Sequence, residues 1–188
     1  MAMFTQRMIV SRATLVVAAL LGAAPLRAQD LSFRAAVGPA IPADGTAERL
    51  HPGPAAMISF ETRVNRAWSL RWDGEWSLLT GRSFPAGRQP DLRAIGASLN
   101  GLRRFSATPV TPYLLLGVGA YRLQRVGAPT RRSRWNVAVQ AGFGIEDGLW
   151  DRVAPFLEVR GMMHLTDYAS AEFTPSVYCP ILIGVRIW

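Results

Sequence analysis

Apolar and polar side chains alternate along most of the chain after residue 30, most clearly over residues 68–79. One face of this segment carries only apolar or small residues, namely Trp68, Leu70, Trp72, Gly74, Trp76 and Leu78. The other face carries polar residues, namely Ser69, Arg71, Asp73, Glu75 and Ser77. Because successive side chains of a β-strand point to opposite faces, this period of two predicts a strand. Neither apolar stripes at helical spacing nor runs of 18 apolar residues occur after residue 30, so the sequence predicts no transmembrane helix there.

The same alternation recurs in other segments, which predicts an all-β chain of eight antiparallel strands. The predicted strands are 31–41, 55–64, 68–79, 92–105, 110–124, 135–146, 154–165 and 177–188. Segment 110–124 is apolar on both faces, which leaves its orientation open. Short connections at 65–67, 106–109 and 147–153 alternate with longer ones. In an up-and-down barrel alternate connections share a rim, so this alternation is typical of outer-membrane barrels with short turns at one rim.

The first 28 residues have the pattern of a secretory signal peptide. Arg7 and Arg12 precede an apolar run at 13–24, and Leu26-Arg27-Ala28 offers a cleavage site. The run is shorter than the roughly 20 residues that a helix needs to span a bilayer. We therefore expect a cleaved signal peptide at 1–28, followed by one barrel domain at 29–188.

Alternation alone does not tell which face of the barrel points outward, but the charges favour a membrane barrel. The polar faces carry five arginines and five acidic residues: Arg34, Arg63, Arg71, Arg160, Arg186, Glu61, Asp73, Glu75, Glu146 and Glu158. Enclosed charges need partners, and this set is balanced, so we predict that it forms a charge network in the lumen. Strands of about ten residues also match a tilted bilayer span. A soluble periplasmic, lipocalin-like barrel with the apolar face inside remains an alternative.

Aromatic residues lie near the predicted strand ends, which predicts girdles at the two membrane interfaces. The expected girdle residues are Trp68, Phe105, Tyr113, Phe156 and Trp188 on the short-turn side and Trp76, Tyr121, Trp135 and Tyr178 on the other. Trp72 is expected to face lipid between them.

The chain resembles small outer-membrane β-barrel proteins of the OmpA and OmpX type, which are porin-like barrels. The likeness rests on the signal peptide, the eight strands, the run PYLLLGVGAY at 112–121 and the ending PILIGVRIW at 180–188. It implies residence in the outer membrane of a Gram-negative bacterium, among lipid and lipopolysaccharide. It also implies that the last strand, ending in Trp188, is read by the barrel assembly machinery. Trp188 does not share the parity of Ile183 and Ile187, so the register of this strand stays open.

The net charge of +8 comes from 21 basic residues, all of them arginine, against 13 acidic ones. Loss of the signal peptide would remove three arginines. Four arginines cluster in the third long loop, namely Arg125, Arg131, Arg132 and Arg134. We expect them to contact lipid phosphates, with a solvated loop as the alternative. Nucleic acid is not an expected partner, because the chain is exported and no aromatic residues are interleaved with these arginines.

One candidate for catalysis is the set His164, Thr166 and Glu172, which is similar to the His, Ser and Glu of outer-membrane lipid A deacylases. Thr166 stands where those enzymes have serine, so we expect no enzymatic activity. The chain has one cysteine, Cys179, and two isolated histidines, so no metal site or other cofactor is predicted. Gly117 and Gly119 are not followed by a predicted helix, which argues against dinucleotide binding.

Eight strands leave a lumen just wide enough for side chains. We therefore expect a monomeric barrel with a filled lumen and a structural or surface-interaction role. The alternatives are a lipid A-modifying enzyme, a small-solute channel and the soluble binding barrel.

Overall fold

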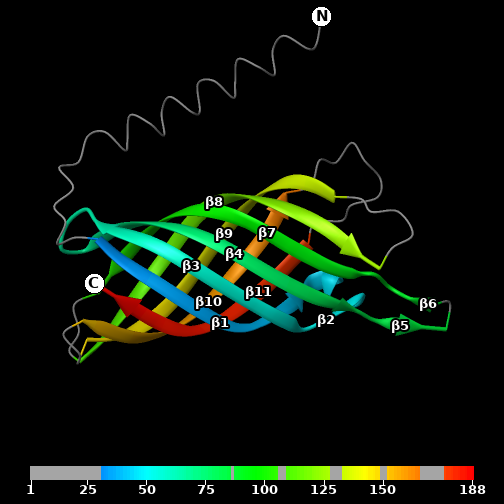
Figure 1. Ribbon diagram of the computed structural model, residues 1–188, viewed down its shortest axis with the longest axis horizontal. Helices are drawn as coiled ribbons and strands as arrows, with labels where there is room; N and C mark the ends of the chain where they lie inside the picture. Colours follow the sequence, from blue (N-terminus) through cyan, green and yellow to red (C-terminus); the bar gives the residue numbers. More distant parts are fainter. Residues whose placement is uncertain (1–30, 86, 106–108, 128–132, 149–151, 166–175) are drawn as a thin grey trace, which may run out of the picture.

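The computed structural model describes residues 31–85, 87–105, 109–127, 133–148, 152–165 and 176–188 (Figure 1). The predicted signal peptide lies outside these ranges, and so do Arg131, Arg132, Thr166 and Glu172. Within the described residues, no helix is long and apolar enough to cross a membrane.

Eight long antiparallel strands form a closed barrel, which confirms the predicted fold class. The strands are β1 (Leu31–Ala43), β3 (Gly53–Arg63), β4 (Trp68–Gly81), β7 (Asp91–Arg104), β8 (Val110–Val126), β9 (Ser133–Asp147), β10 (Val153–Leu165) and β11 (Ser176–Ile187). Each long strand pairs with its neighbour along the chain, and β1 pairs with β11 to close the barrel. Closure leaves none of these strands with a free edge.

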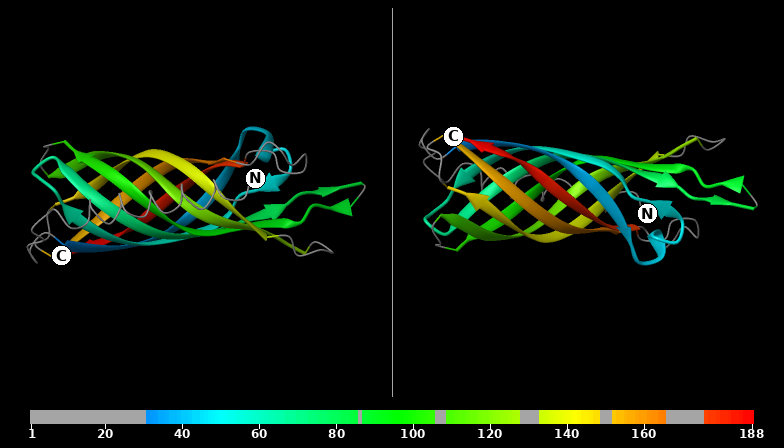
Figure 2. Two further views of the ribbon diagram at one scale, coloured as in Figure 1. Left: turned by 90° about the horizontal axis from the view of Figure 1, so that it is seen from above. Right: turned by 90° about the horizontal axis from the view of Figure 1, so that it is seen from below.

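The two ends of the barrel differ, as the predicted connection lengths indicate. At one end, which we call the short-turn end, β3 runs into β4 through residues 64–67. The opposite end, which we call the long-loop end, carries the 3₁₀ turn η2 (Asp44–Thr46), the short strand β2 (Leu50–His51) and a hairpin of β5 (Ser83–Phe84) and β6 (Gly87–Arg88). This hairpin extends beyond the barrel wall, and the last residue of the chain lies at the short-turn end (Figures 1 and 2).

The barrel is apolar outside and charged inside, the reverse of a water-soluble barrel. Leu116 is 71% exposed and Ile183 63% exposed, whereas Arg34 and Arg71 are fully buried. An exterior of this kind suits the hydrocarbon interior of a bilayer. In water, the same barrel would expose a continuous apolar surface, which is unfavourable. The predicted outward apolar face is therefore confirmed, and the alternative of an apolar lumen in a soluble barrel is wrong.

The structure settles the orientation of β8, which alternation left open. Tyr113, Leu115 and Leu123 are at most 3% exposed and point inward, whereas Leu116 and Val118 point outward. Both faces of β8 are therefore apolar for different reasons. Its outward side chains belong to the apolar outer surface of the barrel, and its inward side chains pack in the lumen.

The girdle prediction is wrong for four of the aromatic residues. Tyr113, Tyr121, Phe156 and Tyr178 are buried in the lumen. Strand parity explains the error, since Phe156 shares its parity with the buried Glu158 on β10. Four tryptophans do lie outside: Trp68 and Trp135 are exposed, and Trp72 and Trp76 are half-buried on the outward face, whereas Trp188 is exposed at the mouth of the barrel.

Glycines on the inner wall make room for the large side chains of the lumen. Five of them lie on three adjacent strands, β7 to β9, namely Gly96, Gly117, Gly119, Gly142 and Gly144. A Cβ atom on Gly144 would lie 2.4 Å from Cζ of Tyr113, and one on Gly117 would lie 1.8 Å from Oδ1 of Asn100. Because heavy atoms cannot approach so closely, these positions require glycine as long as Tyr113 and Asn100 keep their places.

The outward face of β8 provides a test of the membrane orientation. Val118 lies halfway along β8 and points outward, so Val118→Arg should lower the free energy of unfolding in lipid vesicles by about 2–4 kcal/mol. Gln124→Arg, on the same face near the strand end, should cost about 0–1 kcal/mol. Urea unfolding followed by tryptophan fluorescence measures both, and equal costs would contradict the orientation.

Alanine substitutions at two glycines test the packing of the inner wall. Gly144→Ala should destabilise the barrel by about 1–3 kcal/mol, because the new methyl group overlaps the ring of Tyr113. Gly161→Ala is the matched control, since its Cβ would meet nothing closer than the carbonyl oxygen of Ala141 at 3.9 Å. This control should be neutral or slightly stabilising. The idea fails if both variants unfold at the same urea concentration as the parent.

Candidate functional site

The charged side chains of the lumen form two ion clusters, one close to the short-turn end and one near the middle of the barrel. The end cluster, close to the short-turn end, consists of Arg34, Glu61, Arg104, Glu146 and Arg186. The central cluster consists of Arg71, Asp73, Glu75, Glu158 and Arg160. Both are built from inward-facing positions of strands on different sides of the barrel, so they tie the wall together across the lumen.

In the end cluster three guanidinium groups share two carboxylates. Arg34 donates from Nε to Glu61 Oε2 at 3.0 Å and from Nη2 to Glu146 Oε2 at 2.6 Å. Arg104 reaches the same two carboxylates at 2.6 and 2.8 Å, and Arg186 lies 3.0 Å from Glu146. Each glutamate therefore bridges at least two arginines from different strands.

In the central cluster two guanidinium groups share three carboxylates. Arg71 donates from both terminal nitrogens to Glu158, at 2.8 and 3.0 Å, and lies 2.9 Å from Asp73. Arg160 contacts Glu158 and lies 2.9 Å from Asp73 and 2.8 Å from Glu75. The two-pronged contact of Arg71 fixes the orientation of both groups, because the planar guanidinium matches a carboxylate.

Tyr113 connects the two clusters. Its hydroxyl donates to Glu158 at 2.7 Å and accepts from Nη1 of Arg34 at 3.4 Å. Neutral side chains complete the central network, with Asn100 donating to Asp73 and Gln140 donating to Ser98. The polar lumen is thus one continuous network rather than a set of separate pairs.

Two positions differ from the predicted lumen set. Arg63 has inward parity, but it is the last residue of β3 and its side chain is exposed at the mouth of the barrel. Arg104, which the sequence analysis did not single out, takes its place in the end cluster. The parity of Asn100, continued to the end of β7, would have found it. The other predicted charged residues all point into the lumen.

The two clusters do not balance separately. Three arginines against two glutamates leave the end cluster with one excess positive charge, and two arginines against three carboxylates leave the central cluster with one excess negative charge. The five-against-five balance therefore holds only for the lumen as a whole. The excess charges attract each other along the barrel axis.

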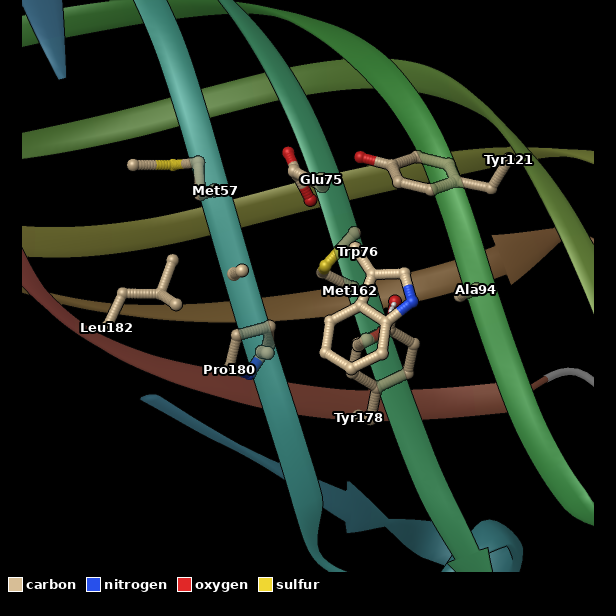
Figure 3. A pocket seen from close by; sticks show the side chains of 12 residues that line it. Met57, Glu75, Trp76, Ala94, Tyr121, Met162, Tyr178, Pro180 and Leu182 are labelled. Atoms are coloured by element: carbon tan, nitrogen blue, oxygen red, sulfur yellow. Dashed lines mark hydrogen bonds between the residues drawn. The ribbon is translucent and has the colours of Figure 1, made fainter. Parts of the chain in front are cut away.

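Above the clusters, toward the long-loop end, the lumen becomes largely apolar. His164 is fully buried there between Tyr121, at 5.1 Å between ring centroids, and Tyr178, at 5.4 Å. Neither ring nitrogen of His164 has a hydrogen-bond partner within the described part of the chain. A cavity of about 10 Å³ lies in this region, with Glu75, Tyr121, Met162 and Tyr178 among its lining residues (Figure 3). It has room for about one water molecule.

The predicted arginine loop is only partly described. Arg125 is half-buried near the end of β8, and Arg134 is exposed near the start of β9. Arg125 pairs in register with Leu92, and Arg134 pairs with Leu123. Both arginines therefore have inward parity at the rim of the barrel. Arg122 lies on the outward parity beside Trp135, with its Nε donating to Ser133 at 3.1 Å. Arg122 therefore points to the outer face of the barrel, unlike Arg125 and Arg134.

Trp188 follows β11 and does not share the lipid-facing side of the strand. Its ring lies 4.7 Å from the guanidinium carbon of Arg186, whose side chain points inward. The register question is settled by the pairing of Ile187 with Phe33 on β1, which keeps Ile183, Val185 and Ile187 outward. Trp188 thus covers the charged mouth of the lumen while remaining 45% exposed.

The described residues do not assemble a catalytic or metal-binding site from the candidates of the sequence analysis. His164 faces the lumen, its predicted companions Thr166 and Glu172 lie outside the described residues, and Cys179 is half-buried. In the described ranges, no group of three or more His, Cys, Asp or Glu side chains is arranged to hold a metal ion.

The unequal clusters predict unequal effects of two isosteric substitutions. Glu61→Gln leaves three buried arginines with one carboxylate in the end cluster, so it should destabilise the barrel by about 3–5 kcal/mol. Glu75→Gln leaves two arginines with two carboxylates in the central cluster, so its cost should stay below about 1 kcal/mol. Urea unfolding in vesicles compares the two. A larger loss for Glu75→Gln would contradict the charge count.

Comparison with known proteins yields matches in structure but not in sequence. No family model matches the chain, and no curated protein matches it. Among solved structures, Neisserial surface protein A matches with a TM-score of 0.63 and 15% identity, covering 84% of this chain and 96% of that one. The outer membrane protein OprG from Pseudomonas aeruginosa matches with a TM-score of 0.58 and 14% identity, over 84% and 94% of the two chains. The outer membrane enzyme PagL matches with a TM-score of 0.51 and 12% identity, over 84% and 99%. The chain thus has the fold of the small outer-membrane β-barrels.

Proposed function

We propose that this protein is an outer-membrane barrel of a Gram-negative bacterium with a structural or surface-interaction role. One observation carries the proposal, namely an apolar exterior around a sealed core of paired charges. Such an exterior is favourable only in a lipid bilayer, and a core of this kind leaves the two rims as the surfaces available to partners. A cleaved signal peptide at 1–28 belongs to this proposal, because an outer-membrane protein must be exported.

The filled lumen argues against a solute channel. Arg71 and Glu158 meet across the lumen, and both side chains are fully buried. The cavity beside Glu75 holds about one water molecule rather than a water column. A solute would have to break the central cluster in order to pass, and separating a buried pair costs about 3–5 kcal/mol.

The position of His164 argues against lipid A deacylation, although the barrel shares its fold with an outer membrane enzyme. A deacylase has to bring its base to an ester bond in the surrounding lipid. His164 is instead enclosed in the lumen between Tyr121 and Tyr178, behind the barrel wall. We therefore propose a non-enzymatic role.

The long-loop rim is the surface that we assign to interaction with lipopolysaccharide and outside partners. The hairpin of β5 and β6 exposes Phe84 beyond the wall, and Arg122 and Trp135 combine a phosphate-binding group with an interfacial aromatic ring. Arg125, Arg131, Arg132 and Arg134 extend this basic rim in the sequence. We further propose that the last strand is the segment read by the barrel assembly machinery. A barrel without free strand edges has no need of a second copy, so we propose a monomer.

Insertion and conductance test the proposed function together. The full-length protein should be extractable only with detergent, migrate differently on a gel before and after heating, and give no discrete channel openings in planar bilayers. Lipid A incubated with it should keep all its acyl chains by mass spectrometry. A folded, water-soluble monomer would overturn the membrane assignment. Stable unitary conductance or deacylated product would overturn the filled-lumen or the non-enzymatic assignment, respectively.

A further inference from the structure

The short-turn mouth of the barrel contains an open cavity of about 310 Å³. Its lining combines arginines and aromatic residues, namely Arg63, Arg66, Arg104, Arg186, Phe105 and Trp188. Two carboxylates, those of Glu146 and Asp147, also line it. The cavity is thus an arginine-rich recess with an aromatic rim, and it is distinct from the long-loop surface considered above.

Part of this lining is already built and held in place. The side chains of Arg104 and Arg186 are 8% and 10% exposed, and both lie within 3.0 Å of Glu146. They belong to the end cluster, which has one positive charge more than its carboxylates compensate. A buried excess charge is costly, so an anion entering from the mouth would be stabilised there.

Two further arginines stand at the entrance. Arg63 and Arg66 are exposed, and neither forms an ion pair with the described residues. With them the lining carries four arginines against Glu146 and Asp147. The ring of Trp188, held over Arg186, forms an apolar wall beside these charges.

We propose that this cavity binds a phosphate-class oxyanion. Guanidinium groups recognise phosphate through paired hydrogen bonds, and Arg63 and Arg66 line a recess large enough for such a group. Arg104 and Arg186, which already donate to Glu146, add positive charge beside it. The phosphate can come from a soluble phosphate ester or from a phospholipid headgroup beside the mouth. The binding chemistry is the same for both and does not depend on the role proposed for the opposite rim.

Binding of inorganic phosphate to the full chain, folded in a phosphate-free alkyl maltoside detergent, tests the proposal. Isothermal titration should show saturable binding, and the thermal unfolding midpoint should rise with phosphate but not with chloride at matched ionic strength. Arg66→Gln should weaken binding about tenfold, as expected for the loss of one charged hydrogen bond. Arg152→Gln is the matched control, because Arg152 is exposed at the same end but does not line the cavity. Absence of saturable binding, or equal weakening by both variants, would overturn the proposal.

A second variant supplies the missing anion from within the chain. Ala154 is buried, lines the cavity and pairs in register with Arg186. Ala154→Asp should therefore abolish phosphate binding while the barrel keeps its heat-modifiable migration, which shows that it is folded. Phosphate binding as tight as in the parent would contradict a role for the excess charge.

Vesicles distinguish the two sources of phosphate. If a phospholipid headgroup occupies the cavity, inorganic phosphate binding seen in maltoside should disappear in phosphatidylglycerol vesicles. If the natural ligand is soluble, binding should persist there. Either result presupposes the binding in detergent, and neither depends on whether the barrel conducts or modifies lipid A.

Discussion

An arginine enclosed in a lumen only eight strands wide cannot reach water, and its charge has to be met by other side chains. Most of the architecture described here follows from that constraint. Because the apolar face of each alternating strand forms the outer surface, the charged face of the same strand points into the lumen. The charged side chains are stable there only as a network, in which four of the five clustered carboxylates serve more than one guanidinium group, as Glu158 and Glu146 do.

The network also dictates the shape of the wall around it. Long side chains such as Arg71 and Arg160 come from β4 and β10, whereas the enclosed inward positions of β8 carry glycine, leucine and tyrosine. Gly144 and Gly117 leave space that Tyr113 and Asn100 fill, so a small residue on one strand is matched to a large one on another. The packing of a narrow barrel therefore links positions that are far apart in the sequence, and glycine is as necessary to the charge network as the charges themselves.

Period-two alternation was sufficient to predict the eight strands, the two kinds of rim and the inward location of most charges. It failed where it was not followed to the strand ends. Arg104 obeys the parity of its strand but was not predicted to be in the lumen, and Phe156 obeys it but was predicted to lie outside. Arg63 also obeys it, yet its side chain lies beyond the enclosed part of the lumen. The partition into two clusters could not be predicted, because it depends on the register between strands. Only that register brings Arg104 beside Glu61 and Glu146 rather than beside Asp73.

The partition matters for function because it makes the two ends of the lumen chemically different. A balanced network would be inert toward ions at either mouth. Here the excess positive charge lies next to the short-turn opening, while the excess negative charge lies deeper, below an apolar section that contains His164 and two tyrosines. The long-loop end is thus closed by apolar packing, and the short-turn end exposes guanidinium groups that are held by their partners but not neutralised by them. A barrel whose lumen is filled by side chains can in this way still present a different chemical surface at each of its ends.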